Sequence, residues 1–286
     1  MGFRTVIIKE RSKLDLNMGY LVSRNQEGET RVYIPEISCL ILESTSLSLT
    51  TALLSELAKN NVSVIFCDEK HNPESQMLPF YGSYNTSKKL MQQQKWQEQT
   101  KSLVWQQIIK QKIKNQAFLL NLIGKKEAGL MLKIYAEQVL LNDSTNREGH
   151  AAKVYFNSLF GLDFERREDS KTNSALNYGY ALLLSCFNRE IVSNGYVTQL
   201  GIWHKNEFND FNLASDLMEP FRPLIDKQVL ELDDEQGYKS QMLNIYNLQI
   251  KINGKKQFLE NAISVYCQSV FEVLNNNGGD IIFYDM

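Results

Sequence analysis

The chain has 286 residues, of which 43% are hydrophobic and 22% charged, the composition of a globular protein that can bury a core without disulfides. This length suggests one large domain or two domains of ordinary size. The formal net charge of −2 argues against a uniformly basic coat for non-specific nucleic-acid binding. Any phosphate contacts must therefore come from locally placed lysines and arginines.

The sequence offers no sign of a membrane or secretory segment. No stretch reaches the roughly eighteen apolar residues of a membrane span, and the charged start of the chain does not resemble a signal peptide. The four cysteines lie far apart in apolar runs, with no pair at zinc-ligand spacing. We therefore expect a soluble, cytoplasmic protein with reduced core thiols and no membrane partner.

The first 72 residues predict a small β-rich domain. β-Branched runs and alternating apolar residues indicate strands at residues 5–8, 14–18, 20–22, 31–34, 39–42 and 62–67. Leu49, Leu53 and Leu57 share one face of a helix between the last two strands. Residues 73–86 are rich in Pro, Gly, Asn and Ser, which predicts a linker.

Residues 87–286 predict a larger, all-α domain, so the expected fold class is α+β. Helical periodicity appears at residues 87–122 (one helix or two), 126–141, 174–193 and 256–275. Asn194–Gly195 is a good helix stop, because both residues tolerate left-handed geometry. Asn253–Gly254 is a candidate turn, and residues 281–284 form either a short strand or a disordered tail.

Glu148 is the first candidate for chemistry. It lies on one helical face with Ala151, Ala152 and Tyr155, and the small alanines leave room for a ligand to approach the carboxylate. The alternative is a capping box with Thr145, in which the glutamate only satisfies a backbone amide. From these residues alone the cap is favoured.

Two later segments contribute an imidazole and two carboxylates. His204 follows Trp203 in a predicted loop, where a histidine usually packs and forms hydrogen bonds without any catalytic role. Asp216 and Glu219 are three residues apart among apolar neighbours, although an ion pair of Glu219 with Arg222 is the simpler explanation. Taken together, the acids and one histidine suit Mg²⁺ or Mn²⁺. Such ions catalyse phosphodiester chemistry by polarising a phosphoryl oxygen.

At this point the chain resembles the Cas-one family of CRISPR-associated adaptation integrases, and within it the type II-A proteins most closely. The resemblance rests on three motifs together: residues 147–155 (REGHAAKVY), 200–204 (LGIWH) and 215–223 (SDLMEPFRP), with residues 169–180 as a further signature. It extends to the whole architecture, because these proteins have an N-terminal β domain, a linker and an α-helical catalytic domain. It gives the N-terminal domain a dimerisation role.

The resemblance implies a catalytic metal site at Glu148, His204 and Glu219. Many relatives have an aspartate where this chain has Glu219, which is longer by one methylene. The ligand could therefore be Asp216 in place of Glu219, or both acids together. The implied reaction joins 3′-hydroxyl ends of short DNA fragments to the CRISPR repeat by transesterification, with endonuclease activity, in antiviral spacer acquisition. The implied partners are DNA, a second copy of the chain and a small second adaptation protein, Cas-two.

Cationic and aromatic side chains near the motifs are candidates for DNA contacts. We assign Arg166, Arg167 and Lys171 to phosphate binding and place Tyr155 and Tyr178 at the same interface. Lysines of the first long helix are weaker candidates, because a solvated helix surface explains them equally well: Lys88, Lys89, Lys95, Lys110, Lys112 and Lys114.

Two other functions remain compatible with the residues. A metal-dependent nuclease would use the same site but release cleavage fragments in place of joined strands. A non-catalytic assembly module would use Glu148 as a cap and pair Glu219 with Arg222.

Overall fold

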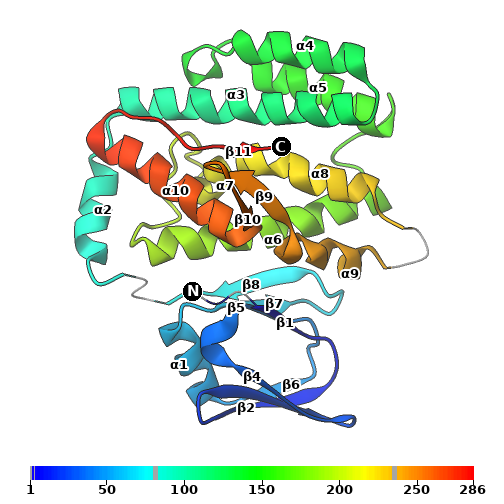
Figure 1. The fold of residues 1–286 in the computed structure, drawn as a ribbon, viewed down its shortest axis with the longest axis vertical. Coiled ribbons are helices and arrows are strands. Elements are labelled where there is room, and N and C mark those ends of the chain that lie inside the picture. Colours follow the sequence, from blue (N-terminus) through cyan, green and yellow to red (C-terminus); the bar gives the residue numbers. More distant parts are fainter. Residues whose placement is uncertain (1, 3, 80–82, 234–236) are drawn as a thin grey trace. The chain divides into compact units, whose positions relative to one another are not determined.

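The computed structural model describes residues 2, 4–79, 83–233 and 237–286. The chain divides into two compact units, one of Met1–Thr86 with Val192–Gly195 and one of Ser87–Ile191 with Tyr196–Met286 (Figure 1). β Structure predominates in the first unit and helices in the second, so the predicted α+β class is confirmed.

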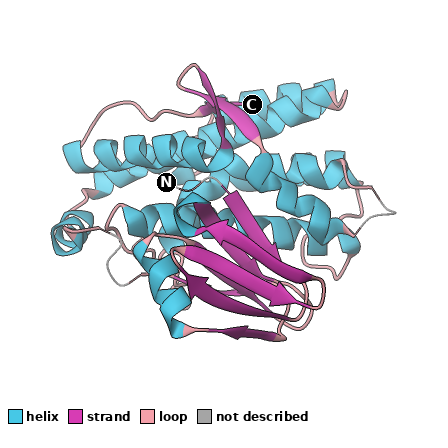
Figure 2. Ribbon diagram, turned by 60° about the horizontal axis from the view of Figure 1, so that its bottom comes forward, coloured by secondary structure: helices cyan, strands magenta, loops and turns pink. Residues whose placement is uncertain are grey.

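The N-terminal unit contains two four-stranded sheets, whose strands Figure 2 shows gathered in one β-rich body. The first sheet has the order β1-β5-β7-β8, with β8 antiparallel to β7 and the other pairs parallel. Its strands are β1 (Arg4–Ile8), β5 (Ile37–Leu42), β7 (Ser63–Cys67) and β8 (Pro73–Met77). The second sheet has the order β4-β3-β2-β6. Its strands are β2 (Ser12–Asn17), β3 (Tyr20–Asn25), β4 (Gly28–Tyr33) and β6 (Leu47–Leu49).

Helix α1 (Thr51–Lys59) contributes to the core of this unit. The side chain of Thr50 caps its first turn by accepting a hydrogen bond from the Leu53 amide. Leu53 and Leu57 are one turn apart and buried in the same cluster as residues of β1, β2, β3, β5 and β7. All six residues of β5 are buried, as expected for a parallel strand covered on both faces.

The predicted linker, residues 73–86, is only partly as expected. Its first five residues form strand β8, which pairs with β7. Residues 80–82 of the segment, including Gly82, lie outside the described residues. The composition misled because a proline is tolerated at the first residue of an edge strand, and Pro73 is that residue of β8.

The second unit is mostly helical. Its helices are α2 (Thr86–Gln94), α3 (Glu98–Leu122), α4 (Lys126–Glu137), α5 (Arg147–Phe160), α6 (Lys171–Ser193), α7 (Asn212–Met218), α8 (Arg222–Leu230), α9 (Tyr238–Met242) and α10 (Leu259–Asn276). Helix α3 is central, because it contacts α4, α5, α7, α8 and α10, with α4 and α5 on one side of it (Figure 1). Helix α6 ends just before Asn194–Gly195, as predicted, and Gly195 has a φ of 83°.

Two prolines shape the segment around Glu219. Helix α7 gives way to a 3₁₀ turn at Glu219–Phe221, and α8 follows directly. Pro220 and Pro223 each lie at the start of the turn or helix that contains them, where no intrahelical amide bond is lost. This succession of short pieces replaces the long helix that the prolines exclude.

The all-α description of the second unit is wrong in one respect. Strands β9 (Gln249–Ile252), β10 (Lys255–Phe258) and β11 (Tyr284–Asp285) form a small antiparallel sheet in the order β10-β9-β11. Asn253 and Gly254, with φ of 48° and 72°, form the two-residue turn of its hairpin. A tail strand, one of the two predicted alternatives, is present, but it covers Tyr284–Asp285 and shares only Tyr284 with the predicted residues 281–284.

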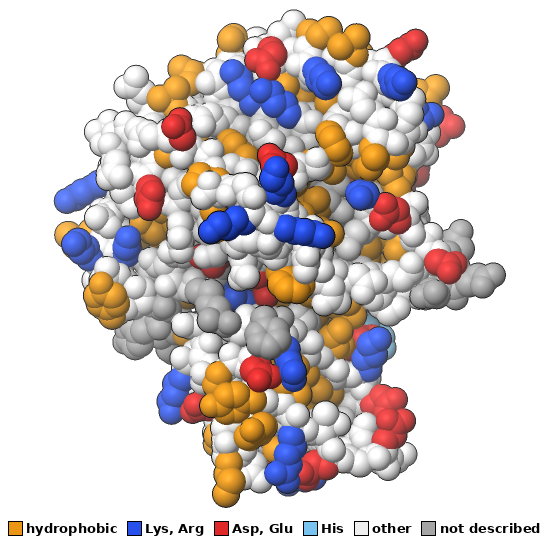
Figure 3. All heavy atoms as spheres, viewed as in Figure 1, with side chains coloured by type: hydrophobic (Ala, Val, Ile, Leu, Met, Phe, Trp, Pro, Cys, Tyr) orange, Lys and Arg blue, Asp and Glu red, His pale blue; other side chains and the backbone are white. Residues whose placement is uncertain are grey.

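The surface carries charges of both signs. On the face shown in Figure 3, Lys and Arg side chains are interspersed with Asp and Glu, in keeping with the near-neutral net charge. All four cysteines are buried thiols, as predicted. Within the described ranges, no helix is both long and apolar enough to span a bilayer.

Candidate metal and phosphate site

The side chain of Glu148 does not cap the start of α5, because other residues bind the amides of its first turn. Asn146 is the N-cap residue and accepts a hydrogen bond from the Gly149 amide. The Asp143 carboxylate accepts bonds from the amides of Arg147 and Glu148, at 2.8 and 3.0 Å. The predicted capping box between Thr145 and Glu148 is therefore wrong, because other acceptors already satisfy the first-turn amides.

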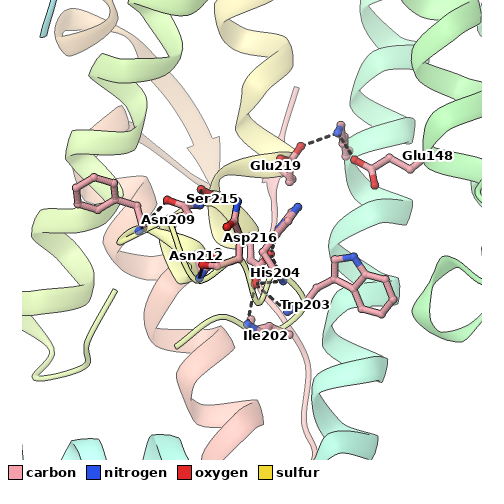
Figure 4. A network of polar contacts seen from close by, with 12 residues as sticks. Glu148, Ile202, Trp203, His204, Asn209, Asn212, Ser215, Asp216 and Glu219 are labelled. Carbon is pink, nitrogen blue, oxygen red and sulfur yellow. Dashed lines mark hydrogen bonds and ion pairs between the residues drawn. The ribbon is translucent and has the colours of Figure 1, made fainter. Parts of the chain in front are cut away.

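Glu148 instead meets Glu219 across the side chain of Lys112. The Nζ atom of Lys112 lies 2.5 Å from Oε1 of Glu148 and 2.6 Å from Oε2 of Glu219. Figure 4 shows the two glutamates on either side of this contact. Lys112, predicted to lie on a solvated helix surface, is thus buried in α3 and paired with both motif glutamates.

Glu219 is held from two sides. Its Oε1 accepts a 2.9 Å hydrogen bond from Nε of Arg222, so the ion pair proposed as the simpler explanation exists. Burial alone would raise the pKa of Glu219, but the charges of Arg222 and Lys112 outweigh it and lower the pKa to about 2. The carboxylate is consequently ionised, as a metal ligand must be, and 5% exposed.

Asp216 fixes the loop that carries His204. Its Oδ2 accepts hydrogen bonds from the amides of Ile202 and Trp203 at 2.7 and 2.8 Å, and its Oδ1 lies 2.5 Å from Nδ1 of His204 (Figure 4). The Asp216 side chain is fully buried. These contacts occupy both carboxylate oxygens, which favours Asp216 as the partner that orients the histidine over Asp216 as a metal ligand.

The imidazole of His204 is turned for coordination through its other nitrogen. With Nδ1 facing Asp216, Nε2 is left for a ligand, and the side chain is 44% exposed. The hydrogen bond to Asp216 raises the pKa of His204 against its partial burial, and the charges of Glu219 and Glu148 act in the same direction. Trp105 packs against the ring edge-on and stacks on Trp203, which restricts the loop further.

The residue types fit Mg²⁺ or Mn²⁺, whereas the side-chain positions fit an ammonium ion. Two carboxylates converge on one cation with an imidazole nearby, which is a hard donor set. In the described part of the chain, no three His, Cys, Asp or Glu side chains already surround one metal position. A metal would therefore have to take the place that Lys112 holds between Glu148 and Glu219.

A cavity of about 420 Å³ opens beside this cluster. The residues that line it include three cationic side chains besides Lys112, namely Arg166, Arg167 and Arg222, together with Glu219, Asn177 and Tyr180. Arg166 is held by Asn173 and Asn177, each at 2.9 Å. The arginines chosen from their place between two motifs thus adjoin Glu219, while Lys171 is exposed at the first residue of α6.

The two tyrosines expected at the DNA interface are buried. Tyr155 is inaccessible, and its hydroxyl donates to Oδ2 of Asp226 at 2.8 Å, while Tyr180 donates to Oδ1 of the same carboxylate. Tyr178 is 2% exposed and lies under Lys239. Direct phosphate contact by Tyr155 or Tyr178 is therefore wrong, because neither ring reaches the surface.

Lys112 and Asp226 are the site residues that sequence reasoning missed. From the sequence, Lys112 is only one of the weaker candidates for a DNA contact, and Asp226 has no role. The buried positions of Ile108 and Ile109, one turn before Lys112, are a signal that this face of α3 points inward.

Residues 5–262 match the family described as CRISPR associated protein Cas1. The chain belongs to this family. It is 37% identical to the CRISPR-associated endonuclease Cas1 of Neisseria meningitidis over 85% of this chain and 80% of that one. It is 26% identical to an endonuclease Cas1 of Francisella tularensis subsp. novicida over 87% and 89% of the two chains.

Solved structures share the fold of this Cas1 protein. A casposase bound to integration product superimposes with a TM-score of 0.80 at 19% identity, covering 98% of this chain and 92% of that one. The CAS1 protein of Thermotoga maritima gives 0.73 at 13% identity, covering 99% and 100%. A chain of a Cas6-RT-Cas1–Cas2 complex gives 0.76 at 17% identity, covering 96% of this chain and 35% of that one. None of these proteins is named by subtype, so the likeness to type II-A stays a prediction.

Proposed function

We propose that Glu148, His204 and Glu219 hold the divalent ion with which this Cas1 protein, a DNA integrase and endonuclease of CRISPR adaptation, acts on phosphodiesters. The observation that supports this most is the convergence of Glu148 and Glu219 on one buried cation. Bound there, Mg²⁺ or Mn²⁺ would polarise a phosphoryl oxygen and stabilise the charge of the transition state.

The chain's own residues would position the reactants. Asp216 holds His204 in one tautomer and orientation, through Nδ1. Arg166 and Arg167 line the cavity beside Glu219 and would bind the phosphates that flank the reacting one. Positioning and preorganised charge carry most of the catalysis in such a reaction.

The proposed reaction is a transesterification. The 3′-hydroxyl oxygen of a short DNA fragment attacks a phosphorus atom at the border of the CRISPR repeat and forms a new P–O bond. The attacking hydroxyl loses its proton, the bond from that phosphorus to the 3′-oxygen of the adjoining nucleotide in the attacked strand breaks, and this leaving oxygen takes up a proton. Water in place of the 3′-hydroxyl would give the endonuclease product.

We propose short DNA duplexes, repeat DNA, a second copy of this chain and a Cas2 protein as partners. The casposase and the Cas1–Cas2 assemblies support DNA and Cas2 as partners, since this chain shares their fold. Dimerisation through the N-terminal unit, which includes strand β8, and catalysis in the unit that begins at Ser87 complete the proposal.

A strand-transfer assay tests the function. The purified chain is mixed with its Cas2 partner, Mn²⁺ or Mg²⁺, a labelled duplex with free 3′-hydroxyls and a plasmid that carries the repeat. We expect metal-dependent joining that is lost in Glu148→Ala and His204→Ala. Fragments without joined product would instead support the plain nuclease.

A further inference from the structure

Lys112 occupies an unusual position for a lysine. The residue is 9% exposed, and its ammonium group is within 2.6 Å of two carboxylates that come from different elements, α5 and the 3₁₀ turn. Its neighbour Lys114, on the same helix, is 47% exposed at the side chain and pairs with Glu137 on the surface. A solvated surface position accounts for Lys114. It does not account for Lys112, because burying an ammonium group is costly unless opposite charges pair with it.

The charges around Lys112 balance without any metal. Glu148 and Glu219 contribute two negative charges, and Lys112 and Arg222 two positive ones, at distances of 2.5 to 2.9 Å. Each carboxylate lies within hydrogen-bonding distance of the Lys112 ammonium group, which is the geometry of a charge-assisted ion pair. The lysine therefore occupies the place of a cation between the two glutamates.

A divalent ion cannot join this cluster without a rearrangement. It would share the two carboxylates with an ammonium group a few ångströms away, in a buried setting where like charges repel strongly. Lys112 also lines the adjoining cavity, which therefore offers room for its side chain to swing out. The cavity is lined by Arg166, Arg167 and Arg222, so an anion entering it would gain Lys112 as a fourth cation.

We propose that Lys112 is a built-in counter-ion, which holds the place between Glu148 and Glu219 until a divalent ion takes it, and then turns into the cavity to bind a DNA phosphate. The inference rests on the proposed metal site. Without DNA, the metal must displace the ammonium group of Lys112 from the two glutamates. With DNA, a phosphate in the cavity stabilises the lysine in its displaced position. Metal and DNA consequently bind cooperatively.

The test is Mn²⁺ affinity, measured from the electron paramagnetic resonance signal of free Mn²⁺, on the full chain with and without a DNA duplex. We expect Lys112→Met to bind Mn²⁺ at least about tenfold more tightly than wild type without DNA, because the competitor is gone. In the same variant, the gain in Mn²⁺ affinity on adding DNA should shrink. Lys114→Met, the matched surface control, should behave as wild type.

Weaker or unchanged Mn²⁺ binding in Lys112→Met would overturn the proposal, since a purely structural ion pair predicts one of those results. Lys112→Arg covers the case in which the methionine variant does not fold: it keeps the charge, so Mn²⁺ should bind no more tightly than to wild type, and tighter binding would contradict the proposal. Glu148→Gln distinguishes failure of the metal site itself. If that variant binds Mn²⁺ as wild type does, the proposed function fails, whatever Lys112 does.

Discussion

Oδ1 of Asp216 lies 2.5 Å from Nδ1 of His204, and Oδ2 of Asp216 accepts hydrogen bonds from the two backbone amides that precede His204 in the chain. One buried carboxylate thus sets both the loop and the orientation of the imidazole. Removing its charge should disturb metal binding without removing a ligand.

Asp216→Asn tests this role. We expect its Mn²⁺ affinity to fall by about 10- to 100-fold, the usual effect of losing a partner that orients a ligand. Isothermal titration calorimetry on the purified chain measures the change, and Asp163→Asn, at an exposed loop residue, serves as the control. Complete loss of Mn²⁺ binding, as severe as in His204→Ala, would indicate that Asp216 is itself a ligand.

Asp226 should make the stability of the second unit depend on pH. Burial raises its pKa to about 6, against hydrogen bonds from Tyr180 and Tyr155, whereas the unfolded value is 3.8. The folded state therefore binds more protons between these values, and stability falls as the pH rises from about 4 to about 6. This difference of about two pKa units corresponds to roughly 3 kcal/mol of unfolding free energy.

Asp226→Asn removes this titration. Relative to wild type, its free energy of unfolding should rise by roughly 3 kcal/mol between pH 4 and pH 7. Urea unfolding followed by tryptophan fluorescence reports on this unit alone, because Trp96, Trp105 and Trp203 all belong to it. A difference that stays constant with pH would mean that Asp226 has an ordinary pKa.

Arg166 and Arg167 should account for part of the salt dependence of DNA binding. Replacing both with Gln removes two candidate phosphate contacts, so the slope of log K against log salt should become less steep by about two. Fluorescence anisotropy with a labelled duplex at several salt concentrations gives the slope. Lys255→Gln with Lys256→Gln, an exposed pair on β10, is the control. An unchanged slope would exclude both arginines from phosphate binding.

Asp143, which accepts two first-turn amides of α5, should stabilise that helix more than Thr145 does. We expect Asp143→Ala to lower the free energy of unfolding by about 1 kcal/mol. Thr145→Ala should cost less than about 0.5 kcal/mol, as at an ordinary surface site. Urea titration of both variants provides the measurement, and the reverse order would restore Thr145 as the cap.

Local periodicity predicted much of the fold because strands and helices bury a regular set of positions. Leu53 and Leu57 in α1, and the stop at Asn194–Gly195, follow from spacing and backbone preference alone. The hairpin at Asn253–Gly254 was signalled by its turn alone: QIKI alternates polar residues with two buried isoleucines but has only four residues, and KKQF is mostly polar.

The site was harder to read, since its contacts join distant segments. Lys112 lies 36 residues before its partner Glu148. Ile108 and Ile109, one turn before it, indicate an inward face of α3 but not which side chain pairs with Lys112. Tyr155 was placed at the DNA interface although its spacing from the small, buried Ala151 equally indicates a core position. Such errors arise where tertiary packing, not sequence neighbourhood, decides exposure.

The most direct test of the account is a crystal structure of the chain with Mn²⁺ and duplex DNA, measured near the manganese absorption edge. The account predicts an anomalous peak bonded to Glu148, Nε2 of His204 and Glu219, with the Lys112 ammonium group turned away from it toward a phosphate. A peak coordinated by Asp216 in place of Glu219, or no peak at Glu148 and His204, would contradict it.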